Sequence, residues 1–239
     1  MKKQLPHEGH RERLKARFIE NGLHGFEEHN ILELLLFYSI PRQDTNEIAH
    51  ALIDRFGSLK GVLDADFSEL CTVKGIKENS ATLLKLIPQI SKAYAVATDE
   101  NEDLIFESAD KAGYYLTNQF IGETAEVVYV MLLDNSFRLI KTVRLFEGNV
   151  NSTAIDRRKI AEIAIKNNAS SIIIAHNHPN GIACPSTDDI QTTSGLLSVF
   201  SSIGIHVLEH FVVAGKSFVP IIKEAQLSRR PNSPKLKYI

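Results

Sequence analysis

Tryptophan is absent from this 239-residue chain, and cysteine and methionine occur only twice each. Cys71 and Cys184 cannot form a dense disulfide framework, so we expect a reducing compartment and a cytoplasmic protein. No apolar run approaches the roughly 20 residues that span a bilayer, so no membrane association is expected. Residues 1–15 also lack the apolar segment of a signal peptide.

The chain also lacks a large excess of positive or negative charge. The chain has 27 Lys and Arg residues against 29 Asp and Glu residues, a formal net charge of −2. Residues 1–95 balance to zero, so neither half has the charge of a basic nucleic-acid-binding domain. Apolar residues make up 44% of the chain, which is ordinary for a globular protein, and the length fits one large domain or two small ones.

The pattern of apolar residues changes near residue 96. Before this point, helical spacing predicts helices over 11–22, 30–40, 45–57 and 80–97. Thr45 is expected to cap the third helix, and Pro88 is expected to kink or end the fourth. The acidic stretch that follows is typical of a linker. We therefore divide the chain into an all-α domain (1–97), a linker (98–104), a second domain (105–225) and a basic tail (226–239).

Strands alternate with helices in the second domain. Val, Leu and aromatic residues predict strands, and helical periodicity predicts helices between them. The strands are expected over 126–134, 136–148 and 171–176, with a closing hairpin over 205–220, and the helices over 157–169 and 188–204. This alternation indicates a layered α/β architecture.

The segment AHNHPNGIACPSTDDI, residues 175–190, carries the most chemical information. His176 and His178 follow an apolar strand, and residues i and i+2 of an extended chain point to the same side. Asp189 is expected in the first turn of the next helix, where a carboxylate is stabilised by the helix dipole. Two neutral imidazoles and a carboxylate form a three-ligand zinc set that leaves a fourth position for water, as catalytic zinc sites do.

A catalytic zinc site also needs a proton carrier and a donor to the oxyanion. Zinc lowers the pKa of bound water toward ~7, and a nearby carboxylate can then accept the proton and return it to the leaving group. Glu126 is the candidate, because a charged residue is out of character at the start of the apolar segment EVVYVMLLD. Ser186, three residues before Asp189, is the candidate hydrogen-bond donor to the oxyanion.

This arrangement resembles the JAMM (MPN+) metalloprotease signature: His-x-His, seven residues, Ser, two residues, Asp, with a glutamate upstream. More specifically, HNHPNG, PSTDDI, the GxxNST segment at 148–153 and EHFVVAGKSFV resemble the RadC family of bacteria. The helical half is similar to the first domain of that family. The resemblance covers residues from about 9 to 222.

The resemblance implies roles for individual residues. His176, His178 and Asp189 match the zinc ligands of the family, Glu126 matches the catalytic acid/base, and Ser186 matches the serine on the oxyanion side. It implies a JAMM α/β sandwich with layers similar to those of cytidine deaminases. Because well-studied JAMM proteins are isopeptidases, it also implies a zinc-dependent hydrolase that cleaves an amide or isopeptide bond in a peptide or protein substrate.

Other interpretations stay open. Residues 70–85 resemble a helix-hairpin-helix, whose backbone N–H groups would bind a DNA phosphate, but Lys77 replaces the second glycine. DNA binding and helix packing in a protein-protein module are both consistent with this segment. The rival to the hydrolase is therefore a DNA-associated repair or protein-binding factor in which zinc mainly shapes the loop. His206 and His210 are expected on one face of a strand, where His210 is either a ligand-orienting group or, as we favour, a core histidine.

Overall fold

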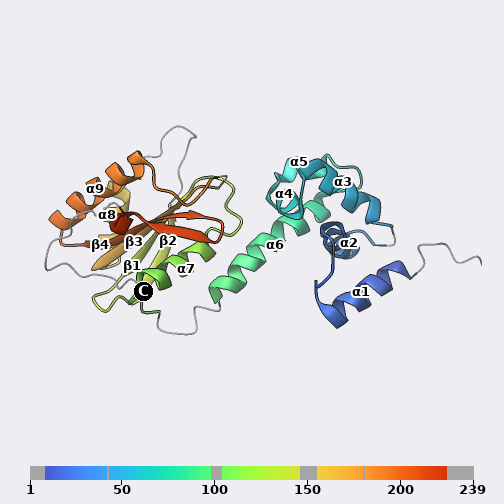
Figure 1. The fold of residues 1–239 in the computed structure, drawn as a ribbon, viewed down its shortest axis with the longest axis horizontal. Helices are drawn as coiled ribbons and strands as arrows, with labels where there is room; N and C mark the ends of the chain where they lie inside the picture. The colour runs from blue at the N-terminus through green and yellow to red at the C-terminus, as the bar shows by residue number, and fades with distance from the viewer. Residues whose placement is uncertain (1–8, 42, 98–103, 146–154, 180, 225–239) are drawn as a thin grey trace, which may run out of the picture. The chain divides into compact units, whose positions relative to one another are not determined.

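The structure is a computed structural model that describes residues 9–41, 43–97, 104–145, 155–179 and 181–224. The chain forms two compact units, Met1–Ser91 and Lys92–Ile239, and each is described by itself (Figure 1). Apart from residue 104, the expected linker lies outside the described residues, as do the GxxNST segment and the basic tail.

The first unit is helical, as the apolar spacing predicts. Its helices are α1 (His10–Asn21), α2 (Glu28–Ser39), α3 (Asn46–Phe56), α4 (Leu59–Asp64), α5 (Phe67–Cys71) and the beginning of α6 (Glu78–Ala97). Leucines 32, 36, 52, 70 and 84 are fully buried in one core cluster. The short helices α4 and α5 have no predicted counterpart, because five or six residues are too few to establish a periodicity. None of the helices in the described ranges has the length and apolar composition needed to cross a membrane.

One local prediction in this unit is wrong, and one of two alternatives in another is wrong. Thr45 precedes α3 but does not cap it with its side chain; the buried hydroxyl donates instead to the carbonyl of Glu33 at 3.3 Å. Of the two outcomes expected at Pro88, a kink or an end of the helix, the end is wrong, because α6 continues through Pro88 to Ala97. Proline removes one N–H donor from a helix of 20 residues, and the remaining turns keep their hydrogen bonds.

The second unit contains a mixed sheet (Figure 1). The sheet has five strands in the order β2-β1-β3-β4-β5. The strands are β1 (Val128–Leu133), β2 (Leu139–Leu145), β3 (Ser171–Asn177), β4 (His206–Ala214) and β5 (Ser217–Pro220). β1 pairs antiparallel with both β2 and β3, whereas β3 and β4 are parallel. Parallel neighbours need a long crossover connection. α9 (Thr187–Ser202) provides this connection, so its first turn lies near the end of β3.

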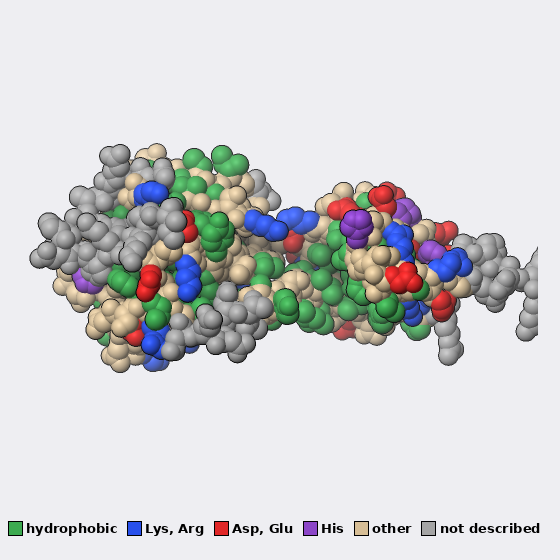
Figure 2. Space-filling view, turned by 60° about the horizontal axis from the view of Figure 1, so that its bottom comes forward, with side chains coloured by type: hydrophobic (Ala, Val, Ile, Leu, Met, Phe, Trp, Pro, Cys, Tyr) green, Lys and Arg blue, Asp and Glu red, His purple; other side chains and the backbone are tan. Residues whose placement is uncertain are grey.

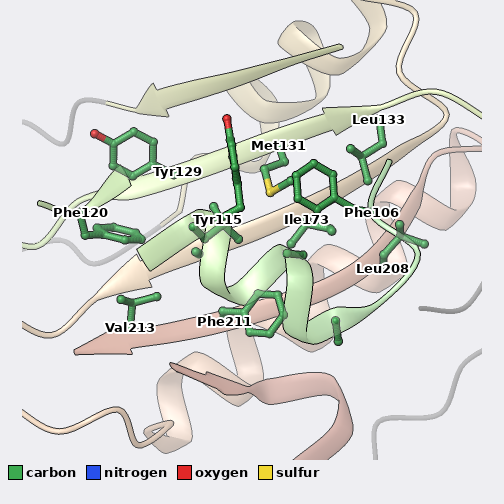
Figure 3. Close-up of a cluster of buried hydrophobic side chains, with 14 of the residues drawn as sticks. Phe106, Tyr115, Phe120, Tyr129, Met131, Leu133, Ile173, Leu208, Phe211 and Val213 are labelled. Atoms are coloured by element: carbon green, nitrogen blue, oxygen red, sulfur yellow. The ribbon is translucent and has the colours of Figure 1, made fainter. Parts of the chain in front are cut away.

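Helices cover both faces of this sheet, which gives the expected α/β layers. α8 (Arg157–Lys166) and α9 share one core cluster with alternate residues of β1 and β3, such as Val130 and Ile174. α7 (Ala109–Gln119) packs on the other face, where Tyr115, Met131 and Phe211 lie together (Figure 3). The short α10 (Ile221–Glu224) follows β5.

α7 is absent from the predicted elements, although its sequence carries a start signal. Ser108 caps the helix by accepting a hydrogen bond from the backbone N–H of Lys111. The buried positions include Ala109, Ala112 and Gly113, small residues that give only a weak apolar periodicity. The glycine is needed because a Cβ there would lie 2.3 Å from the ring of Phe218.

Candidate metal centre

β3 positions the two histidines of the segment His176-Asn177-His178. All seven residues of this strand are buried, and its alternation places His176 on the same face as Ile172 and Ile174, the face that α9 covers. His176 is 2% exposed, and His178 is half-buried just beyond the end of the strand. The centroids of the two rings lie 5.1 Å apart. The i, i+2 spacing therefore brings the rings together, as predicted.

Asp189 comes from the first turn of α9 and faces both histidines. Its Oδ1 lies 3.2 Å from Nε2 of His176, and its Oδ2 lies 3.9 Å from Nε2 of His178. Ser186 and Asp189 form a capping box at the start of α9. The neighbouring Asp188 is the second residue of the helix and takes no part in the capping box, which uses the third. The helix start thus holds the carboxylate at the end of β3.

The capping box fixes the carboxylate of Asp189 through one oxygen. The backbone N–H and the hydroxyl of Ser186 both donate to Oδ2, at 2.8 and 2.7 Å. Burial alone would raise the pKa of Asp189, but the nearby His176 and the hydrogen bonds from Ser186 outweigh it and hold the pKa well below its usual range. Oδ1 remains directed at His176. The hydroxyl of Ser186, the predicted oxyanion donor, is committed to the carboxylate in this arrangement.

Glu126 joins this group from the segment that directly precedes β1. One ligand atom each from Glu126, His176 and His178 lies within 4.8 Å of the others, which makes the three a candidate metal-binding set among the described residues. The antiparallel register pairs Val128 with His176, so Glu126, two residues earlier, shares their face. Its side chain is exposed, unlike that of His176.

One atom in this group behaves as a metal ligand would. Nε2 of His176 is buried and makes no hydrogen bond, although the carboxylate of Asp189 lies 3.2 Å away. Buried polar atoms are normally paired, so an unpaired imidazole nitrogen beside a carboxylate fits a cation between them. Cys184 lies in the same loop but is exposed, and its sulfur is 3.9 Å from the carbonyl of Pro185.

The domain around this centre has relatives of known family. Residues 106–227, which include every side chain of the candidate centre, match the family model of the RadC-like JAB domain. The chain belongs to the RadC family. UPF0758 protein FN0909 of Fusobacterium nucleatum is 35% identical over 223 residues, 91% of this chain and 96% of the relative. UPF0758 protein Mpe_A2695 of Methylibium petroleiphilum is 34% identical over 217 residues, again 91% and 96%. The predicted family resemblance is confirmed, and it extends to the helical unit.

Asn177, between the two histidines, was not singled out from the sequence. Its side chain points to the opposite face of β3 and is 4% exposed. Oδ1 accepts a hydrogen bond from the backbone N–H of Val127 at 2.7 Å, and Nδ2 donates to the carbonyl of Ala125 at 3.0 Å. The amide therefore fixes the backbone on both sides of Glu126. The available signal was a polar residue at the end of a buried apolar strand, where its amide must find partners.

A second buried histidine of the RadC-like JAB domain, His210, contacts the ring of His176. Nε2 of His210 lies 2.9 Å from Nδ1 of His176, and Nδ1 of His210 lies 2.7 Å from the hydroxyl of Thr193. Complete burial, followed by the nearby His176, lowers the pKa of His210 well below its ordinary value. His210 is therefore neutral and in direct contact with the candidate ligand.

The expectation that His206 and His210 share a face is wrong. β4 pairs Ile172 with Val207 but Ile173 with Glu209, so Leu208 is an extra residue in a bulge. This insertion reverses the alternation beyond it and turns His210 toward α9. The buried carboxylate of Glu209 accepts hydrogen bonds from the backbone N–H groups of His210 and Ile222, at 2.9 and 2.7 Å, and holds the bulged segment.

Proposed function

We propose that the RadC-like JAB domain of this chain is a zinc-dependent hydrolase that cleaves an amide or isopeptide bond of a peptide or protein. The convergence of His176, His178 and Asp189, with Nε2 of His176 unpaired at its centre, carries this proposal. The implied likeness of the layers to cytidine deaminases belongs to the same proposal, and the mixed sheet covered by helices on both faces is consistent with it.

The ligand set fits zinc by its chemistry. His176 and His178 would supply imidazole nitrogens and Asp189 a carboxylate oxygen, a set of three protein ligands that leaves one tetrahedral position open. When bound, zinc would polarise the scissile carbonyl and acidify a water molecule. The centre is accessible to solvent on one side, because His178 is half-buried and Glu126 is exposed.

The position of Glu126 supports a role in proton transfer. Its carboxylate lies within 4.8 Å of the two imidazoles but, unlike that of Asp189, it is exposed and free of the capping box. We assign it the role of accepting the proton of the attacking water and returning it to the leaving nitrogen. Such general acid–base catalysis contributes about 10²–10⁴-fold to the rate.

Ser186 would stabilise the oxyanion, and this role requires its hydroxyl to turn. The hydroxyl proton now goes to Oδ2 of Asp189, while the hydroxyl oxygen accepts the backbone N–H of Asp189 at 3.1 Å. Oδ2 also accepts a hydrogen bond from the backbone N–H of Ser186. The hydroxyl can therefore turn its proton toward the oxyanion while the carboxylate of Asp189 stays in place. Ser186→Gly should keep the helix start at a cost of a few tenths of a kcal/mol but lose this donor.

The test separates metal binding from hydrolysis. Glu126→Gln is compared with wild type and with Glu107→Gln, which alters an exposed glutamate away from the centre. Zinc content is measured together with hydrolysis of a panel of peptides and lysine isopeptides. We expect Glu126→Gln to retain zinc and lose at least about 10²-fold in turnover. Turnover equal to wild type on a substrate that wild type cleaves would refute the assigned role.

The rival function predicts that residues 70–85 bind DNA. The turn between α5 and α6 contains Gly75 with φ +96°, and Lys74 and Lys77 are exposed there. Lys85 is held differently, because its amine donates to the carbonyls of residues 63, 64 and 65 at the end of α4, so its donors are already engaged. On the face drawn in Figure 2, charges of both signs are interspersed over the helical unit. A salt-dependent DNA affinity that falls in Lys74→Ala/Lys77→Ala would support binding, and an unchanged one would refute a role for this hairpin.

A further inference from the structure

A hydrogen-bonded chain of three buried side chains runs behind the candidate metal centre. Thr193 of α9 and His210 of β4 are fully buried, and His176 of β3 is 2% exposed. The hydroxyl of Thr193 lies 2.6 Å from the backbone carbonyl of Asp189 and 2.7 Å from Nδ1 of His210. Nε2 of His210 lies 2.9 Å from Nδ1 of His176. These hydrogen bonds thus connect the backbone of one candidate ligand, Asp189, with the ring of another, His176.

The chemistry of these groups fixes where each proton lies. A carbonyl oxygen only accepts, so the single hydroxyl proton of Thr193 must point to Asp189. The hydroxyl oxygen can then only accept from Nδ1–H of His210. A neutral imidazole has one donor and one acceptor, so Nε2 of His210 accepts from Nδ1–H of His176. This leaves Nε2 of His176 without a proton.

We propose that Thr193 and His210 act as positioning residues that fix His176 in its Nδ1–H tautomer and present the lone pair of Nε2 to the metal. The inference rests on the proposed metal site but not on hydrolysis. It accounts for the observation that Nε2, alone among the ring nitrogens of His176 and His210, has no hydrogen bond.

The chain also fixes where the ring of His176 stands relative to Asp189. Thr193 is one turn after Asp189 on α9, and its hydroxyl bonds the carbonyl of that residue. His210 therefore ties the ring of His176 to the same helix that carries the carboxylate. Groups that orient a metal-binding histidine in this way typically change metal affinity by about 10–100-fold when removed.

The decisive variant differs from wild type only at the hydroxyl. Thr193→Val keeps the shape of the side chain but removes the acceptor for Nδ1–H of His210. His210 is then free to carry its proton on Nε2 and donate it to His176, which moves the proton of His176 to Nε2. Thr193→Ser keeps the hydroxyl and is the matched control. His210→Gln, whose amide oxygen can accept from Nδ1–H of His176, is a second variant should Thr193→Val fail to fold.

Two readouts test the proposal. The ¹⁵N shifts of His176 in the metal-free protein report its tautomer directly, and competition with a chromophoric chelator gives the zinc affinity. We expect Nδ1–H in wild type and Thr193→Ser, a shift toward Nε2–H in Thr193→Val, and zinc affinity about 10–100-fold weaker in that variant. His210→Gln should keep the wild-type tautomer.

The outcomes separate this inference from the proposed function. Nε2–H in the metal-free wild type, or wild-type tautomer and zinc affinity in Thr193→Val, would overturn the inference. Wild type that binds no zinc but shows Nδ1–H would overturn the proposed function while supporting the tautomer assignment.

Discussion

Replacing Asn177 with alanine should destabilise the JAB domain and release the backbone around Glu126. The amide makes two hydrogen bonds, to the N–H of Val127 and to the carbonyl of Ala125. Val127 is 4% exposed, so its N–H would be left without water. An unsatisfied buried donor costs about 1–3 kcal/mol.

The second bond adds less to the total. Ala125 is exposed, so water can replace the amide at its carbonyl, and the loss there is about 0.5–1.5 kcal/mol. Together the two terms predict that Asn177→Ala lowers the free energy of unfolding by about 1.5–4.5 kcal/mol. This is large for a polar residue that touches no candidate ligand through its side chain.

Urea unfolding measures this loss, and hydrogen exchange of the Val127 amide locates it. The control is Asn135→Ala, an exposed residue in the turn between β1 and β2, which should cost less than about 0.5 kcal/mol. We expect the Val127 amide to lose protection in Asn177→Ala only. A loss of stability no larger than the control's, with Val127 still protected, would refute the idea that Asn177 fixes the approach to Glu126.

Two further predictions concern other parts of the same unit. Burial alone would raise the pKa of Glu123, but hydrogen bonds from Arg144 and Tyr129 lower it to about 2, from an ordinary 4.5. Its stabilising effect is therefore present above the unfolded pKa and is lost as pH falls toward 2. Urea unfolding across this pH range should show Glu123→Gln about 2–3 kcal/mol less stable at neutral pH, with the gap closing in acid; parallel curves would contradict this. Gly113→Ala should destabilise α7 by about 1–3 kcal/mol because its Cβ would meet Phe218, whereas the same change in an exposed helix stabilises by about 1 kcal/mol. Adding Phe218→Leu should recover part of the loss, and no recovery would assign the cost elsewhere.

The part of the site that could be predicted is the part fixed by local geometry. His176, His178, Ser186 and Asp189 lie within one strand end, one loop and one helix start, and each of these has a known spacing rule. Glu126 is 50 residues from His176, and only the register of β1 against β3 brings them together. The sequence signalled it through a charge at the start of an apolar strand rather than through any spacing.

The rest depends on irregularities that leave no periodic trace. The bulge at Leu208 reverses the face of His210, and a strict alternation of two therefore predicted the wrong side. Small residues hid α7, and a buried hydroxyl drew Thr45 away from its expected capping role. The bulge, α7 and the role of Thr45 depend on tertiary contacts, and the spacing of apolar residues along the sequence does not reveal such contacts.

Metal content per chain tests the central claim most directly. Protein purified without added chelator is measured as wild type, His178→Ala and His206→Ala, the last a histidine of β4 outside the candidate centre. The account predicts about one zinc ion per chain in wild type and in His206→Ala, and its loss in His178→Ala. Wild type that holds no zinc and takes up none on reconstitution, or His178→Ala that keeps it, would contradict the account.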